Sequence, residues 1–227
     1  MKAQLYKEPT YYDAITKASA LIGAKPEDID KKILVFAPEK ATLTIERKIA
    51  AIKGGFMNVR VFSFGKFLKY FGSAEDKVLS KEASVMLIGK ILSETDKLKC
   101  FTHVSGGFAE NLYDSISLLK SAKITPDEIK DVCLDEGVLK DKISDLYTVY
   151  SLYEDCLSKN NYKDENGMLS AIPSLIKSYR DIQKTEVYLV GYDGWTASAR
   201  NIIETLILSA KSVTAVCVGG SNGGVYT

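Results

Sequence analysis

At residues 33–38 the sequence reads Ile33-Leu34-Val35-Phe36-Ala37-Pro38, a short apolar run that contains β-branched residues and stops at proline. Such a run is typical of a strand buried on both faces of a parallel sheet. Residues 59–63, Val-Arg-Val-Phe-Ser, form the next run of this kind and predict a second strand.

A helix is expected between these two strands. The segment LTIERKIAAIK, residues 43–53, places apolar residues at helical spacing. Thr42 or Thr44 is the expected N-cap, and Gly54-Gly55 is the expected end of the helix. Residues 33–63 are therefore predicted to form a strand-helix-strand unit, whose right-handed crossover builds a parallel sheet.

From about Ser80 to Arg180 the pattern changes to long amphipathic helices, and no strand is predicted there. Thr125 followed by Pro126 predicts a capped helix start. Tyrosines at three-residue spacing, at positions 147, 150 and 153, predict a packed stripe in the core rather than a nucleotide platform.

Strands return at residues 186–191 and 212–218, separated by the helix SARNIIETLILSA. The sequence thus predicts a parallel sheet interrupted by a helical insertion of about a hundred residues.

Composition limits the possible functions. Of 227 residues, 46% are apolar and 26% are charged. A chain of this length with this apolar fraction can bury a hydrophobic core. Lysine and arginine (30) nearly balance aspartate and glutamate (29), so no global cationic field attracts polyanions, although a local groove needs only a few cations. The four cysteines, Cys100, Cys133, Cys156 and Cys217, show no metal or disulfide spacing. Neither a signal peptide nor a membrane span is recognisable, and the cytoplasm is the expected location.

The phosphate loop G-x-x-x-x-G-K-[ST] is absent. Gly65-Lys66 is followed by Phe67 and Gly89-Lys90 by Ile91, so neither pair supplies the hydroxyl that binds magnesium. Both pairs are interpreted as turn and helix positions.

Two residues follow the strand at 186–191. Asp193 occupies the place where P-loop enzymes hold magnesium through a carboxylate, a degenerate Walker B-like position. The alternative is that Asp193 and Thr196 shape the turn and cap the next helix. Trp195 either stacks on a base or packs over the end of the sheet. His103 lacks a partner nucleophile, so no catalytic residue is predicted. The glycine-rich GGSNGG near the carboxyl terminus is interpreted as a flexible end or linker.

Several stretches together resemble the amino-terminal helicase-like region of AddB, the B subunit of the bacterial AddAB ATP-dependent helicase-nucleases. They are ILVFAPEKATLTIERKI, VRVFSFGKFLKYFG, LSKEASVMLIGKIL, GFAENLYDSISLLKSAKITPDEI, DKISDLYTVYSLYEDCL and EVYLVGYDGWTASARNIIETLI. The resemblance implies a RecA-like, P-loop NTPase-like fold of the superfamily 1 helicase 1A/1B type. Residues 1–74 and 181–227 would form the discontinuous 1A-type α/β domain, and residues 75–180 the helical 1B-like insertion.

The resemblance also implies a fragment of a protein that processes double-strand breaks for recombinational repair. Its partners would be DNA, as a single strand or a duplex end, and an AddA-type helicase-nuclease subunit, with no membrane. ATP and Mg are cofactors of the family, and its iron–sulfur cluster would lie beyond residue 227. No metal or cofactor is expected in this chain itself. The region QLYKEPTYYDAITKA lacks the phosphate-loop glycines, and Pro38-Glu39-Lys40 replaces the family's Pro-Glu-Gln.

We therefore expect a helicase-like DNA-binding scaffold without a complete ATP site. The candidate DNA-binding residues follow sheet strands: Lys40, Ser63, Phe64, Lys66 and Trp195. One alternative is an interaction domain that docks a motor subunit. A second is a small-molecule phosphate or nucleotide-sugar enzyme that uses the same sheet edge and Asp193.

Overall fold

The computed structural model describes residues 2–28, 30–72, 77–96, 98–102, 107–130, 137–219 and 224–226. The chain divides into two compact units. The first comprises residues 1–72, 171–195 and 199–227, and the second comprises residues 73–170 and 196–198. His103, Cys133 and most of the GGSNGG stretch lie outside the described residues.

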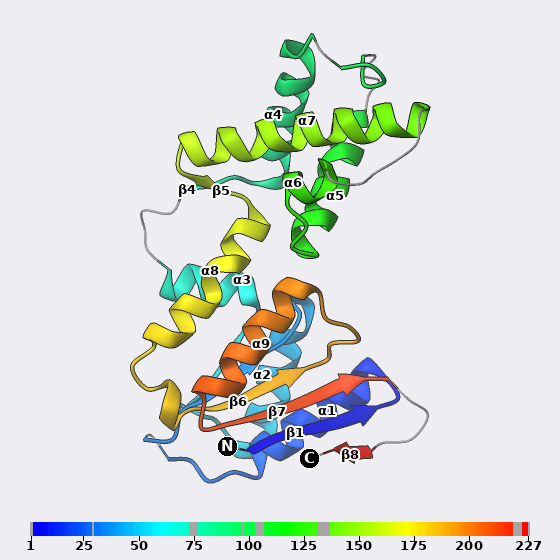
Figure 1. Cartoon of the computed structure of the whole chain (residues 1–227). Coiled ribbons are helices and arrows are strands. Elements are labelled where there is room, and N and C mark those ends of the chain that lie inside the picture. Colours follow the sequence, from blue (N-terminus) through cyan, green and yellow to red (C-terminus); the bar gives the residue numbers. More distant parts are fainter. Residues whose placement is uncertain are drawn as a thin grey trace. The chain divides into compact units, whose positions relative to one another are not determined.

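The first unit is an α/β domain built on a six-stranded sheet (Figure 1). The strand order is β3-β2-β6-β7-β1-β8, and all neighbours are parallel except β8, which runs antiparallel to β1. Its elements are β1 (Lys2–Glu8), α1 (Tyr11–Gly23), β2 (Ile33–Phe36), α2 (Glu39–Lys53), β3 (Val59–Phe62), α3 (Phe64–Phe71), the 3-10 turn η1 (Ile182–Lys184), β6 (Glu186–Val190), α9 (Ala197–Ser209), β7 (Ser212–Val218) and β8 (Gly224–Tyr226).

Strand β2 lies inside the sheet and is buried along its whole length, as its uninterrupted apolar sequence predicts. Ile33 and Val35 pack on the face that α1 and α2 cover, in a core that also includes Ile22 of α1 and Ile45 of α2. The predicted strand-helix-strand unit of residues 33–63 is confirmed.

The start of α2 differs from the prediction. The helix begins at Glu39, directly after Pro38, and neither threonine caps it. Thr42 lies one turn inside the helix, where its hydroxyl donates to the carbonyl oxygen of Glu39 at 3.0 Å. A proline with its fixed φ is well tolerated at a helix start, because the backbone N–H that it lacks would have no partner within the helix there. The predicted end is confirmed, since Gly54 closes α2 in the left-handed conformation with φ 73°.

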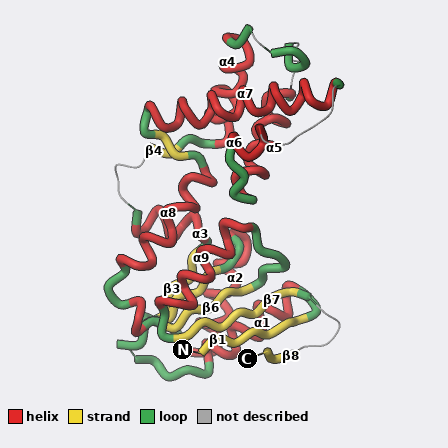
Figure 2. The backbone as a smooth tube through the Cα atoms, viewed as in Figure 1, coloured by secondary structure: helices red, strands yellow, loops and turns green. Residues whose placement is uncertain are grey.

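The second unit is mainly helical (Figure 2). Its elements are β4 (Lys77–Val78), α4 (Lys81–Glu94), α5 (Phe108–Ser121), α6 (Pro126–Lys130), α7 (Val138–Lys159), β5 (Tyr162–Lys163) and the first part of α8 (Glu165–Ser178). Strands β4 and β5 pair in parallel, which corrects the prediction that this block contains no strand. Thr125 caps α6 as predicted, and Glu128 accepts a reciprocal bond from the Thr125 amide at 2.7 Å.

The core of the second unit contains the predicted tyrosine stripe. Tyr150 and Tyr153 are buried, and Tyr147 packs against the same cluster. The Tyr153 hydroxyl lies 3.1 Å from a carboxylate oxygen of Asp164, which also pairs with Lys120 at 2.7 Å. This buried charge is therefore satisfied by both a cation and a hydroxyl. Nowhere in the described part of the chain does a helix combine the length and apolar character that a bilayer crossing requires.

Candidate functional site at the carboxyl edge of the sheet

Parallel strands end at one edge of the sheet, so the segments that follow them come together there. In the first unit these segments follow β1, β2, β3 and β6. They contain every candidate residue from the sequence: Lys40, Ser63, Phe64, Lys66, Asp193 and Trp195. This edge is the candidate functional site.

An aromatic row connects two of these segments, those that follow β3 and β6. The ring of Phe64 lies 5.3 Å, centroid to centroid, from that of Phe36 and 5.8 Å from that of Tyr192, with which it stacks at 23°. Tyr192 in turn lies 4.4 Å from Trp195. Phe64, Tyr192 and Trp195 are half-buried, so each ring packs on its neighbours and keeps part of its surface in solvent. Burial raises the pKa of Tyr192, which therefore stays neutral.

Beside this row, the Glu39 carboxylate binds two of the predicted DNA-binding residues, Ser63 and Lys66. Lys66 Nζ lies 2.9 Å from Glu39 Oε1, and the Ser63 hydroxyl donates to Glu39 Oε2. The same serine caps α3 by accepting the amide of Lys66 at 3.2 Å. The hydrogen bond from Ser63, followed by that from Lys66, lowers the pKa of Glu39 below its ordinary value. Lys66 is exposed, but its charge is largely balanced by Glu39.

Lys40 stands apart from that cluster. It is exposed, and its ammonium lies 5.2 Å from the ring centroid of Tyr11, the first residue of α1. Tyr11 packs against Gly191, where an added Cβ would lie 2.8 Å from its ring. The Tyr11 hydroxyl is buried without a hydrogen-bond partner among the described residues, and burial raises its pKa.

The turn between β1 and α1 is the connection that the family resemblance matches to a phosphate loop. It consists of Pro9 and Thr10 alone. The Thr10 hydroxyl caps α1 by accepting the amide of Asp13 at 3.1 Å and donates to the Asp13 carboxylate at 2.6 Å. The Asp13 carboxylate therefore lies at the helix end where a phosphate would bind. The residues of this turn do not fit a triphosphate with its magnesium ion.

Asp193 follows β6, which is separated from β1 by β7. Its side chain is exposed. Helix α9 begins at Ala197, as the sequence predicts, while the capping roles of Asp193 and Thr196 stay predictions. Among the described residues, no group of three or more histidine, cysteine, aspartate or glutamate side chains is arranged to hold a metal ion.

The structure joins some predicted residues and separates others. Ser63 and Lys66 share Glu39, whereas Phe64 reaches Trp195 through Tyr192. Sequence reasoning missed Glu39 and Tyr192 as members of the site. Both follow predicted strands within a few residues, so their position was the available signal. A role in DNA binding stays a prediction for each of these side chains.

The domain that carries this edge is an α/β domain with a mostly parallel sheet, consistent with a RecA-like fold. Comparison of sequences gives the family. The chain belongs to the family described as "ADDB, N-terminal", whose sequence model matches residues 7–222.

Curated relatives agree with this assignment. The B subunit of the ATP-dependent helicase/deoxyribonuclease of Clostridium tetani is 26% identical over 213 residues, which cover 87% of this chain and 18% of the relative. The proteins of the same name from Clostridium novyi and Bacillus licheniformis are 27% and 25% identical, over 82% and 84% of this chain. The chain spans less than a fifth of the length of these relatives.

Proposed function

We propose that this chain is a helicase-like scaffold domain that binds single-stranded DNA at the carboxyl edge of its sheet. The observation that carries the proposal is the aromatic row formed by Phe64, Tyr192 and Trp195, with Lys40 and Lys66 beside the same strand ends. Partly exposed aromatic rings provide sequence-tolerant stacking surfaces for unpaired bases, and the cations provide contacts to phosphates.

In this proposal the first unit is the 1A-type domain of a superfamily 1 helicase fold, and the helical unit is its 1B-like insertion. The domain acts without a complete ATP site, because the turn before α1 has no glycine cradle and the Asp13 carboxylate lies at the helix end. The relatives are named as one subunit of an ATP-dependent helicase/deoxyribonuclease. We therefore place the domain in a cytoplasmic complex with an AddA-type subunit that processes DNA ends for recombinational repair.

Fluorescence anisotropy of a labelled single-stranded oligonucleotide, measured across salt concentrations, tests the DNA groove. Because Glu39 balances Lys66, Glu39→Gln should strengthen binding at low salt, and Lys66→Gln should weaken it and make the salt dependence less steep. Lys90→Gln on α4, in the other unit, is the matched control and should leave both quantities unchanged. Absence of measurable binding at ~50 mM salt would exclude the groove.

A second candidate function is docking of the motor subunit without any contact to DNA. Two observations favour this alternative: the relatives are named as one subunit of an enzyme complex, and the charges of this chain nearly balance. Two measurements distinguish these functions: complex formation with the partner subunit and binding of the oligonucleotide. A docking domain forms a tight complex with the partner subunit and shows no affinity for the oligonucleotide, whereas the proposed groove binds the oligonucleotide alone.

A further inference from the structure

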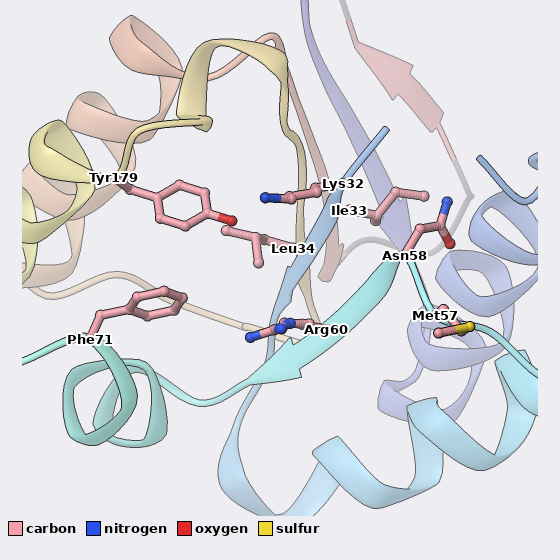
Figure 3. A pocket seen from close by; sticks show the side chains of 8 residues that line it. All are labelled: Lys32, Ile33, Leu34, Met57, Asn58, Arg60, Phe71 and Tyr179. Atoms are coloured by element: carbon pink, nitrogen blue, oxygen red, sulfur yellow. The ribbon is translucent and has the colours of Figure 1, made fainter. Parts of the chain in front are cut away.

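A pocket lies in the first unit, at the amino-terminal ends of β2 and β3 and thus at the opposite ends of these strands from the candidate site (Figure 3). Its volume is about 300 Å³, at the lower end of the range for small-ligand sites. It is lined by Lys32, Ile33, Leu34, Met57, Asn58, Arg60, Phe71 and Tyr179.

Arg60 supplies an available cation to this pocket. Its Nη1 donates to the Tyr70 hydroxyl at 2.7 Å, and the guanidinium lies 5.1 Å from the centroid of the same ring. Among the described residues no carboxylate lies within ion-pair distance of Arg60. A guanidinium carries five N–H donors, so most of them remain for an anion.

The other charges near the pocket are largely paired. Lys32 pairs with Asp181, and the positive charge of Arg60 acts on Lys32. The hydrogen bond from Lys32 lowers the pKa of Asp181, and the charges of Lys184 and Arg180 lower it further. A second carboxylate, that of Glu27, accepts the backbone amides of two lining residues and pairs with Lys53. Arg60 is therefore the lining cation that an anion can approach without displacing an ion pair.

Asn58 contributes an acceptor that no described residue uses. Its side chain is 6% exposed, and Nδ2 donates to the carbonyl oxygens of Asp28 and Lys31, both at 3.1 Å. These two bonds fix which end of the amide is nitrogen. The remaining atom, Oδ1, is buried and has no hydrogen-bond partner among the described residues. Because this atom has almost no accessible surface, Asn58 forms part of the wall of the pocket and does not contact a ligand there.

Two rings form the apolar component of the pocket. Phe71 and Tyr179 pack edge to face with centroids 5.2 Å apart, and both are half-buried. Figure 3 shows both rings on the side of the pocket toward which the Lys32 side chain extends. They provide an apolar surface for a planar group.

We propose that this pocket binds a nucleoside monophosphate, either free or as the terminal residue of a DNA strand. The phosphate contacts Arg60, and the base lies against Phe71 and Tyr179. The combination suits this class because a nucleoside monophosphate carries both an anion for Arg60 and a planar ring for the two aromatic side chains. This site is independent of the aromatic row at the carboxyl edge.

Isothermal titration of the intact chain with dAMP tests the proposal. Arg60→Gln should weaken dAMP binding about tenfold, the value of one lost charge-assisted contact. The matched control is Arg47→Gln, an exposed arginine of α2 outside the pocket, which should bind dAMP like the unaltered chain. Tyr179→Leu should weaken the binding of dAMP more than the binding of inorganic phosphate. Circular dichroism of each variant verifies the fold.

Further arms identify the source of the ligand and separate the two sites. An oligonucleotide that binds more tightly with a 5′-phosphate or a 3′-phosphate than with free hydroxyls indicates a DNA terminus, whereas tighter binding of dAMP indicates the free nucleotide. Lys40→Gln should leave dAMP affinity unchanged, even if it abolishes binding of internal single strands. No saturable dAMP binding up to ~10 mM, or equal affinity of the unaltered chain and Arg60→Gln, would overturn the proposal.

Discussion

Gly191 shows how one residue determines the geometry of the carboxyl edge. It follows β6 with φ 78°, a conformation that side chains rarely adopt, and an added Cβ would lie 2.8 Å from the Tyr11 ring. We expect Gly191→Ala to lower the free energy of unfolding by about 1–3 kcal/mol, from backbone strain and displacement of Tyr11. Urea unfolding followed by circular dichroism measures this loss.

The control for that experiment is three residues away. Gly194→Ala introduces the same methyl group where nothing lies within 4 Å and φ is not positive. Its free energy of unfolding should stay within about 0.5 kcal/mol of that of the unaltered chain. Equal effects of the two substitutions would show that the contact with Tyr11 does not constrain the loop.

For single residues, the sequence predicted which candidates share one edge of the sheet but none of the contacts between them. Ser63, Phe64 and Lys66 were predictable as site candidates because they follow a recognisable strand and parallel strands end at one edge. Their partners were not predictable. The pairing of Lys66 with Glu39 depends on how α2 and α3 are placed, and a pattern of hydrophobic residues contains no information about that distance.

Among the helices and strands, too, some were predictable from the sequence and others were not. Strands β2 and β3 were predictable because burial on both faces demands continuous apolar runs. The pair β4 and β5 was not, since each strand has two residues and Lys77 pairs with Tyr162, 85 positions later. The prediction that Thr42 or Thr44 caps α2 was wrong for another reason. A threonine near a helix start resembles a cap, but Pro38 already provides the entry to α2.

Glu186, at the start of β6, links neighbouring elements at the amino ends of the strands. It pairs with Lys25, which follows α1, and with Lys211, which precedes β7, at 3.0 Å. Burial alone would raise its pKa, but the hydrogen bonds from both lysines outweigh burial and hold the pKa below 4.5. The stabilisation is therefore complete above pH 4.5 and is lost as the pH falls through the lower folded-state pKa.

We expect Glu186→Gln to destabilise the chain at pH 7, by on the order of 1 kcal/mol for partly exposed pairs, and to have a smaller effect at pH 3. Urea unfolding of both proteins at the two pH values gives the difference. Glu204→Gln, an exposed position on α9, should show no such dependence on pH. An effect of Glu186→Gln that stays constant between pH 7 and pH 3 would mean that the carboxylate charge is not its cause.

Both candidate sites of the molecule belong to the same one of its two units. The first unit contains both the carboxyl edge and the pocket at Arg60, and its sheet comes from segments on either side of the helical unit in the sequence. The described residues of the second unit contribute to neither site. The described members of its core, the cluster around Ile116 and Tyr153, all lie between positions 79 and 157.

A core of this kind predicts autonomous folding. Residues 77–170, produced alone, should be helical by circular dichroism and unfold in one cooperative transition, because the apolar cluster and the Asp164 ion pair with Lys120 are both retained. Ile116→Ala removes a fully buried side chain and should cost about 2–5 kcal/mol in the fragment and in the intact chain alike. A fragment that is helical but loses its signal gradually with urea, or that responds to Ile116→Ala differently from the intact chain, would show that this core depends on the sheet domain for its packing.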